Sequence, residues 1–216
     1  MRWTMTIDGE VREPNFIIRR ALAIEFYANL EQALSVVFSI LMKTDKVRSD
    51  IVFFKIINTS IRNKVIGDLL SICFGEQFDI YWYGAPGTPA LSRCPGLFTH
   101  IRALDEQRNR IVHWHTLRYL QEDEKYNSFK FPHEILKKAT SSETMTSDEL
   151  ACFCDKARVI TRAVELFIEF ISVYERGESS ALHHIFQQPI PYPPSESHPL
   201  FHAWNELQDQ PRSSRI

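Results

Sequence analysis

Several features that mark common kinds of protein are missing from this sequence of 216 residues. No apolar run reaches the ~18 residues needed to cross a bilayer. The longest candidate, residues 16–42, is interrupted by Arg19, Arg20, Glu25 and Glu31. The start of the chain lacks the apolar segment of a signal peptide. The four cysteines do not have the spacing of a disulfide framework, so we expect reduced thiols, a cytoplasmic location and no membrane association.

The sequence also lacks a strong charge of either sign and the common phosphate-loop and hydrolase motifs. Its formal net charge is −2 at pH 7, whereas a general polyanion binder is usually basic, so any nucleic-acid contact has to be local. No G-x-x-x-x-G-K-[ST], G-x-G-x-x-G or G-x-S-x-G motif occurs. Cys152 and Cys154 have no convincing further ligands beside them, so we expect neither a metal site nor a cofactor.

Long stretches of helical periodicity dominate what the sequence does contain. Apolar residues recur at three- and four-residue steps in four stretches, namely 15–43, 50–75, 95–112 and 147–176. Residues 58–60 predict a kink or break in the second stretch. Residues 114–131 instead show a pattern typical of a β-hairpin around a charged turn. We therefore predict a mainly all-α fold, a helical bundle with a small β-hairpin inserted before the last long helix.

These stretches divide the chain into a lead-in (1–14), a helical domain (15–176) and a C-terminal extension (177–216). The extension is proline-rich and weakly apolar, so we predict that it is extended or disordered. Residues 76–92 predict a loop, whose aromatic segment FDIYWYG either docks on the bundle or forms a surface patch. A polar stripe on the first helix is either a solvated face or the lining of a groove; it comprises Glu25, Asn29 and Gln32.

The segment DEQRNRIVHWH, residues 105–115, places charged side chains and histidines at the end of a predicted helix. On a helix Asn109 and His113 lie one above the other, while Arg108 lies about 140° round from His113. A guanidinium group binds phosphate, and an imidazole exchanges protons near neutral pH. An amide beside them can hold a phosphate or a hydroxyl. Together these groups could cleave RNA without a metal ion.

A purely structural interpretation of the same segment also has to be considered, because an Arg followed by a His at this distance is a weak signal. In that interpretation Arg110 pairs with Glu106, Asp105 accepts a hydrogen bond from Asn109, and His113 caps the helix C-terminus. The overlapping pair Arg110 and His115 has the same spacing.

The sequence RNRIVH resembles the R-N-x-x-x-H form of the motif that marks HEPN domains, a family of helical ribonucleases and nucleotide-binding modules. The matching positions are Arg108, Asn109 and His113. The pair Arg110 and His115 fits less well, because Ile111 follows the arginine. The order of helices, with the motif at a helix end and a closing long helix, resembles the HEPN layout over residues 15–176.

This resemblance implies a homodimer in which the two motif helices face one cleft. It implies endoribonuclease activity, with Arg108, Asn109 and His113 as the catalytic residues, no metal ion and no cofactor. Nearby basic residues are expected to bind the RNA backbone; they are Arg102, Arg110, His115 and Arg118, and His100 adds to the local basic character. Many prokaryotic HEPN nucleases are similar to toxins or defence effectors, so a neutralising, antitoxin-like protein partner is a further expectation.

Two other functions remain open at this point. The chain could be a non-catalytic HEPN-like dimer that binds a nucleotide, RNA or protein, with Arg108 and His113 kept for structure. It could also be a helical scaffold without a ligand, in which case Arg108 would pair with a carboxylate of its own chain.

Overall fold

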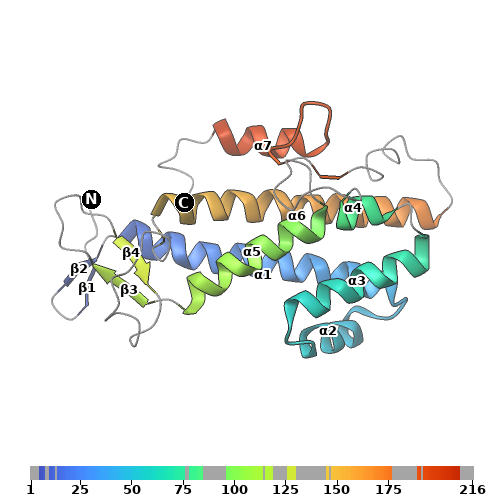
Figure 1. Ribbon diagram of the computed structural model, residues 1–216, viewed down its shortest axis with the longest axis horizontal. Coiled ribbons are helices and arrows are strands. Elements are labelled where there is room, and N and C mark those ends of the chain that lie inside the picture. The colour runs from blue at the N-terminus through green and yellow to red at the C-terminus, as the bar shows by residue number, and fades with distance from the viewer. Residues whose placement is uncertain are drawn as a thin grey trace.

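The computed structural model describes residues 5–7, 10–12, 14–75, 78–84, 96–113, 115–118, 126–129, 145, 147–176, 189–190 and 192–209. This part of the chain is mostly helical, which confirms the mainly all-α part of the prediction (Figure 1). Two long helices, α1 (Pro14–Leu41) and α6 (Ser147–Glu175), lie side by side. No helix among these residues is long and apolar enough to cross a membrane.

Helix α5 (Leu97–His113) packs on α1 and runs in the opposite direction. Arg20 of α1 binds the last carbonyls of α5, whereas Tyr27, two turns further along α1, binds Asp105. The start of α6 is fixed to the start of α1, because Arg19 donates to the hydroxyl of Ser147 over 2.7 Å. The core therefore fills the space between α1, α5 and α6, and the end of α5 is anchored to the start of α1.

Two shorter helices, α2 (Lys46–Lys55) and α3 (Thr59–Phe74), follow α1. The break that the sequence predicts near residues 58–60 is confirmed, since Asn58 is the N-cap of α3 and accepts a hydrogen bond from the Ile61 amide over 3.0 Å. An asparagine at this position satisfies an amide that the helix itself leaves unpaired. Asp45 caps α2 in the same way through the Arg48 amide.

The prediction of a loop over residues 76–92 is wrong at α4 (Asp79–Tyr83). The open question about the aromatic segment is settled in favour of docking, because Phe78, Tyr81 and Trp82 are almost fully buried. The Phe78 and Tyr81 rings pack against α6, with the Tyr81 and Phe167 centroids 4.9 Å apart. Helix formation here follows from burial of this segment rather than from a repeating pattern, because five residues are too few to show one.

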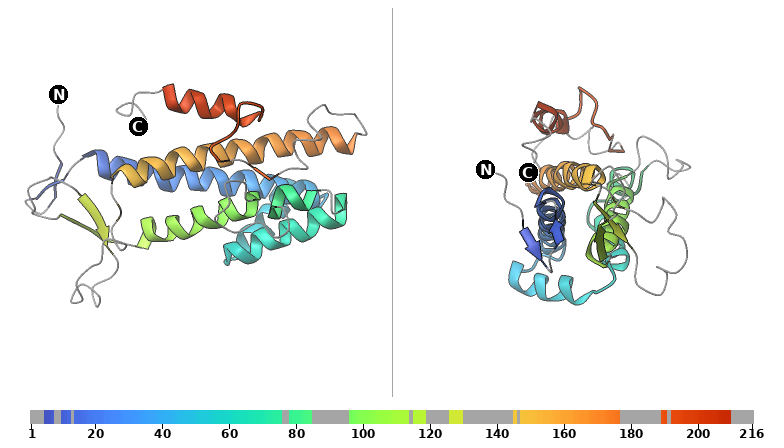
Figure 2. Two further views of the ribbon diagram at one scale, coloured as in Figure 1. Left: turned by 45° about the horizontal axis from the view of Figure 1, so that its top comes forward. Right: turned by 90° about the vertical axis from the view of Figure 1, so that its left-hand side faces the viewer.

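The C-terminal extension is also corrected, since residues predicted to be extended or disordered form α7 (Leu200–Asp209), which lies over α6 (Figure 2). Ile190 and Leu200 are fully buried, and the Tyr192 and Trp204 rings meet edge to face at 5.5 Å. His198 accepts a hydrogen bond from the Leu200 amide at the start of α7. This ordered segment is therefore part of the packed structure rather than a solvated tail.

Four short strands accompany the helices in the described part of the chain. Strands β1 (Met5–Ile7) and β2 (Glu10–Arg12) pair antiparallel ahead of α1. Strands β3 (His115–Arg118) and β4 (Tyr126–Phe129) pair antiparallel after α5, with His115 opposite Phe129. They occupy the place where the sequence predicts a hairpin, and the charged turn between them lies outside the described residues.

The end of α1 forms a Schellman turn. The Lys43 amide donates to the Ile40 carbonyl over 3.0 Å, and the Thr44 amide donates to the Ser39 carbonyl over 3.4 Å. This turn requires a left-handed residue, a position that glycine usually occupies. Here Lys43 adopts it with a φ of 48°, so its backbone is held in a left-handed conformation that is unfavourable for a lysine.

We expect Lys43→Gly to stabilise the protein by roughly 0.5–1 kcal/mol, because relief of left-handed strain exceeds the greater unfolded-state entropy of glycine. Urea denaturation at neutral pH measures the change. The matched control is Met42→Gly one residue earlier, where φ is not positive, and this variant should lose stability. Equal effects at the two positions would contradict the assignment of strain to Lys43.

Candidate functional site

The end of α5 presents a polar stripe to solvent. Residues 102, 106, 109 and 113 recur at steps of four, three and four, so they share one face of the helix. All four side chains are exposed, and they are Arg102, Glu106, Asn109 and His113. The opposite face is buried through Ile101, Leu104 and Ile111. Two of the three predicted catalytic residues, Asn109 and His113, therefore stand together on the open side of α5.

Arg108 is half-buried beside α1, about 140° round the helix from His113. Its guanidinium donates to the Asn109 side-chain oxygen over 3.1 Å and lies 5.5 Å from the centre of the Tyr27 ring. Among the described residues, no carboxylate lies within ion-pair distance of Arg108. The amide of Asn109 therefore links Arg108 to the face that carries His113, and the described residues offer no carboxylate that neutralises Arg108.

Tyr27 forms the floor under Arg108. Its hydroxyl donates to the Asp105 carboxylate over 2.9 Å. Burial, and then the negative charge of Asp105, raise the pKa of Tyr27 above its usual value, so the phenol stays protonated. A neutral ring with its hydroxyl tied to Asp105 offers its face to the guanidinium, which is the geometry of a cation–π contact. Asp105 itself is thereby turned towards α1.

The C-terminus of α5 is capped by Arg20. Its Nε donates to the Ile111 carbonyl over 2.8 Å, and a terminal nitrogen reaches the Val112 carbonyl at 3.4 Å. Part-burial lowers the pKa of Arg20. The structural interpretation of the sequence assigned this capping role to His113. The described contacts give it to Arg20 instead and leave the His113 side chain exposed.

For the other two contacts of that interpretation, Arg110 with Glu106 and Asp105 with Asn109, the structure shows different partners for the two carboxylates. Glu106 lies 3.8 Å from Arg102, one turn earlier, and Asp105 accepts its hydrogen bond from Tyr27. Arg110 is half-buried and has interactions within the chain. The side chains of His115 and Arg118 lie outside the described residues. Of the predicted RNA-binding residues, the structure therefore places only Arg102 on the open stripe.

His100 does not belong to this basic surface. It is 4% exposed, and its Nε2 lies 3.2 Å from the Ile190 carbonyl. Burial lowers the pKa of His100 to about 4, so the side chain is neutral at pH 7. The expectation that it adds to the local positive charge is wrong, because His100 lies on the same buried face of α5 as Leu97 and Leu104. Its role is to hold the C-terminal segment.

His100 should make stability depend on pH. In the unfolded chain a histidine titrates near 6.5, whereas in the folded chain the pKa is about 4, so only the unfolded state takes up a proton between these values. The contribution of His100 to stability is therefore complete above pH 6.5 and is lost towards pH 4, by on the order of 3 kcal/mol. Urea unfolding of wild type and His100→Gln across this range measures the effect, since glutamine does not titrate. Identical pH slopes for the two proteins would contradict it.

Tyr27 and Arg20 were not identified as site residues from the sequence. Tyr27 occupies a regular core position on α1 with Ala23 and Leu30, and nothing in the spacing indicates that its ring lies beneath Arg108. Arg20 is visible in the sequence only as a charge in an apolar stretch. Both roles arise from the crossing of α1 and α5, which joins residues about 80 to 90 positions apart.

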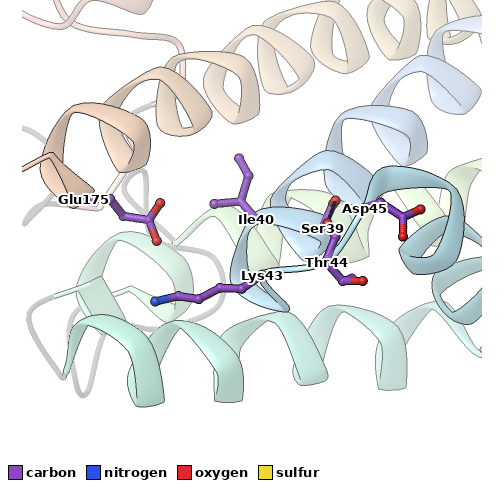
Figure 3. Close-up of a pocket in the computed structure, with 6 residues that line it drawn as sticks. All are labelled: Ser39, Ile40, Lys43, Thr44, Asp45 and Glu175. Atoms are coloured by element: carbon purple, nitrogen blue, oxygen red, sulfur yellow. Dashed lines mark hydrogen bonds between the residues drawn. The ribbon is translucent and has the colours of Figure 1, made fainter.

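Two cavities lie away from the end of α5. A pocket of about 640 Å³ lies where the α1–α2 turn faces the end of α6, and Figure 3 shows Lys43 and Glu175 reaching towards it from the two sides. A smaller groove of about 240 Å³ lies between α1 and α6 and includes Asn29, so that one residue of the predicted polar stripe lines a groove while Glu25 and Gln32 are exposed. Within the described ranges, no group of three or more His, Cys, Asp or Glu side chains is arranged to hold a metal ion.

No protein-family model, curated protein or solved structure matches this chain. The functional interpretation therefore depends on the RNRIVH motif, the order of the helices and the geometry at the end of α5.

Proposed function

We propose that the chain is a metal-independent endoribonuclease of the HEPN type, acting as a homodimer through the open end of α5. The observation that carries the proposal is the pairing of Arg108 with the Asn109 amide on the edge of the stripe that exposes His113. The guanidinium has no carboxylate partner among the described residues, so it is available to an anion. A planar guanidinium binds phosphate through two parallel hydrogen bonds.

The proposed reaction is an attack of the ribose 2′-hydroxyl on the adjacent phosphorus. His113 takes the proton of the 2′-hydroxyl as a general base. Arg108 stabilises the charge that develops on the phosphate oxygens, and Asn109 orients the guanidinium through their hydrogen bond. The bond from phosphorus to the 5′-oxygen breaks, and the leaving oxygen takes a proton from the second subunit's copy of the imidazole. The products are a 2′,3′-cyclic phosphate and a 5′-hydroxyl.

A dimer explains why polar groups gather on an open helix face. The stripe of Arg102, Glu106, Asn109 and His113 is exposed in one subunit. A two-fold axis beside this stripe would bring two such faces together around a solvent-filled cleft. Each subunit would contribute one Arg108 and one His113 to it. Arg102 is placed to bind the RNA backbone along the same face, and Arg110, His115 and Arg118 remain candidates for that role.

A non-catalytic HEPN-like dimer is the second candidate. It is favoured by one contact, the position of Arg108 over the Tyr27 ring at 5.5 Å, because this contact gives the arginine a packing role. Such a dimer would bind RNA, a nucleotide or a protein without cleaving it. If the catalytic proposal holds, a cytoplasmic toxin or defence role with a neutralising, antitoxin-like partner fits the activity.

Incubation of the purified protein with single-stranded RNA in EDTA tests the proposal. Cleavage with 2′,3′-cyclic phosphate and 5′-hydroxyl ends supports it. Loss of cleavage in EDTA, or 3′-hydroxyl products, would reject the proposed chemistry. RNA that binds at saturation and stays intact would favour the non-catalytic dimer.

A further inference from the structure

Helix α2 and its junction with α3 expose apolar side chains to solvent. The exposed fractions are 70% for Val47, 59% for Ile51, 45% for Phe54, 93% for Ile57 and 55% for Ile61. We call these five residues the α2 surface. Within α2, the buried residues are Ser49 and Phe53, so most of the apolar content of this helix points outward. Nothing in the described part of the chain covers it.

The α2 surface is continuous along the chain. Val47, Ile51 and Phe54 recur at steps of four and three and form one stripe on α2. Ile57 lies in the three-residue junction, and Ile61 lies in the first turn of α3. In Figures 1 and 2, α2 lies at the outer edge of the molecule, against α1. The stripe on α2 from Val47 to Phe54 is about 10 Å long, because each residue of a helix rises about 1.5 Å, so it spans about two helical turns.

Five exposed apolar side chains gathered on one short helix and its junction call for a partner. Scattered single apolar side chains are ordinary on a soluble protein, whereas adjacent ones that exceed a few hundred Å² mark an interaction site. The mostly polar outer faces of α5 and α6 show that this chain does not expose such residues everywhere. The α2 surface therefore has the character of an interface.

The charges around this surface indicate what binds there. Lys46 and Arg48 are already neutralised by Asp50 and Asp45, at 2.6 Å and 3.1 Å. Lys55 and Lys64 are exposed beside Phe54 and Ile61, and no carboxylate among the described residues pairs with either. The charges left free at the edge of the surface are therefore positive.

We propose that the α2 surface binds the apolar face of an amphipathic helix from another protein, with acidic residues along the edges of that helix. A second copy of this chain fits less well, because a two-fold interface would bring the free lysines of both copies together, and their positive charges would repel. An anionic membrane also fits less well, since the two free lysines are fewer than the ~4–8 cations typical of lipid-binding clusters. The inference does not depend on RNA cleavage at α5.

Two model peptides of about 14 residues test this inference. Both carry the same leucine stripe at helical spacing, and one has glutamate along the edges where the other has lysine. Titrations of the full-length chain, followed by fluorescence anisotropy, should show binding of the glutamate peptide at least tenfold tighter than the lysine peptide. Added salt should weaken it, because the attraction is between exposed charges.

Substitutions locate the binding site. Ile51→Asp with Ile57→Asp should weaken binding of the glutamate peptide at least tenfold, because both side chains would carry the contact. Lys55→Glu with Lys64→Glu should reverse the preference between the peptides. Ile72→Asp is the matched control, since Ile72 is 79% exposed and lies three turns beyond Ile61 on α3, and its binding should equal that of wild type.

Four results would overturn the inference. They are no binding of the glutamate peptide up to about 1 mM, equal binding of the two peptides, binding that the α2 substitutions leave unchanged, and self-association of the chain that Ile57→Asp abolishes. Co-sedimentation with vesicles containing phosphatidylserine, lost in the same α2 variants, would assign the surface to a membrane instead.

Discussion

His113→Ala is expected to lower the rate of RNA cleavage by about 10²–10⁴-fold, the usual contribution of a general acid or base. The thermal melt should not change, because the His113 side chain is exposed and caps nothing: the carbonyls at the end of α5 are bound by Arg20. Single-turnover cleavage of a short RNA in EDTA, with protein in excess, measures the chemical step directly.

His202→Ala on α7 serves as the matched control for this variant. His202 is also an exposed histidine on a helix, and its replacement should leave the rate unchanged. Arg108→Lys adds a second comparison, because lysine keeps the positive charge but lacks the planar guanidinium that donates two parallel hydrogen bonds to a phosphate. A rate for His113→Ala within about threefold of wild type would remove this residue from the mechanism, whatever the activity of the other variants.

Glu31→Ala is expected to destabilise the protein by about 3–5 kcal/mol, the cost of leaving a buried charge without its partner. Arg62 donates to the Glu31 carboxylate from α3, and its side chain is only 5% exposed. Its guanidinium also lies 4.5 Å from the centre of the Phe53 ring, so it has little freedom to turn to water. Chemical denaturation should show the loss, with a drop in Tm on the order of 10 °C.

A double variant separates the loss of the pair from the loss of packing. Glu31→Leu with Arg62→Met removes both charges and keeps similar volumes, and we expect it to recover most of the lost stability. A single variant that costs less than about 1 kcal/mol would mean that water already solvates Arg62. Glu31 lies one turn from Tyr27 on α1, so this pair also supports the helix face beneath Arg108.

The sequence predicts the long helices well because their signal is local. The apolar spacing over residues 147–176 is nearly the extent of α6, and the polar break before α3 is visible in Asn58, which turns out to be its N-cap. Helices α4 and α7 were missed for the opposite reason. Helix α4 forms because Tyr81 packs on α6. Helix α7 forms because Tyr192 and Trp204 pack together, and the proline-rich composition around them gives no sign of such a contact.

The candidate site was predictable in part. The positions of Asn109 and His113 on one open face follow from four-residue spacing. The floor under Arg108 and the cap by Arg20 do not, since both arise where α1 crosses α5. His100 shows the same limit: as a basic residue near the motif it looks like part of an RNA-binding surface, but its place on the helix directs it into the core, against Ile190.

The proposed active site requires two copies of the α5 stripe to face each other around one cleft. Glu106 lies two turns before His113 on that stripe and is exposed, so a photo-crosslinking amino acid at position 106 reports what the stripe contacts in solution. The account predicts a crosslinked homodimer whose linked peptides, identified by mass spectrometry, both come from α5. Irradiation that yields only uncrosslinked chains, or links from position 106 to another part of the partner, would contradict it.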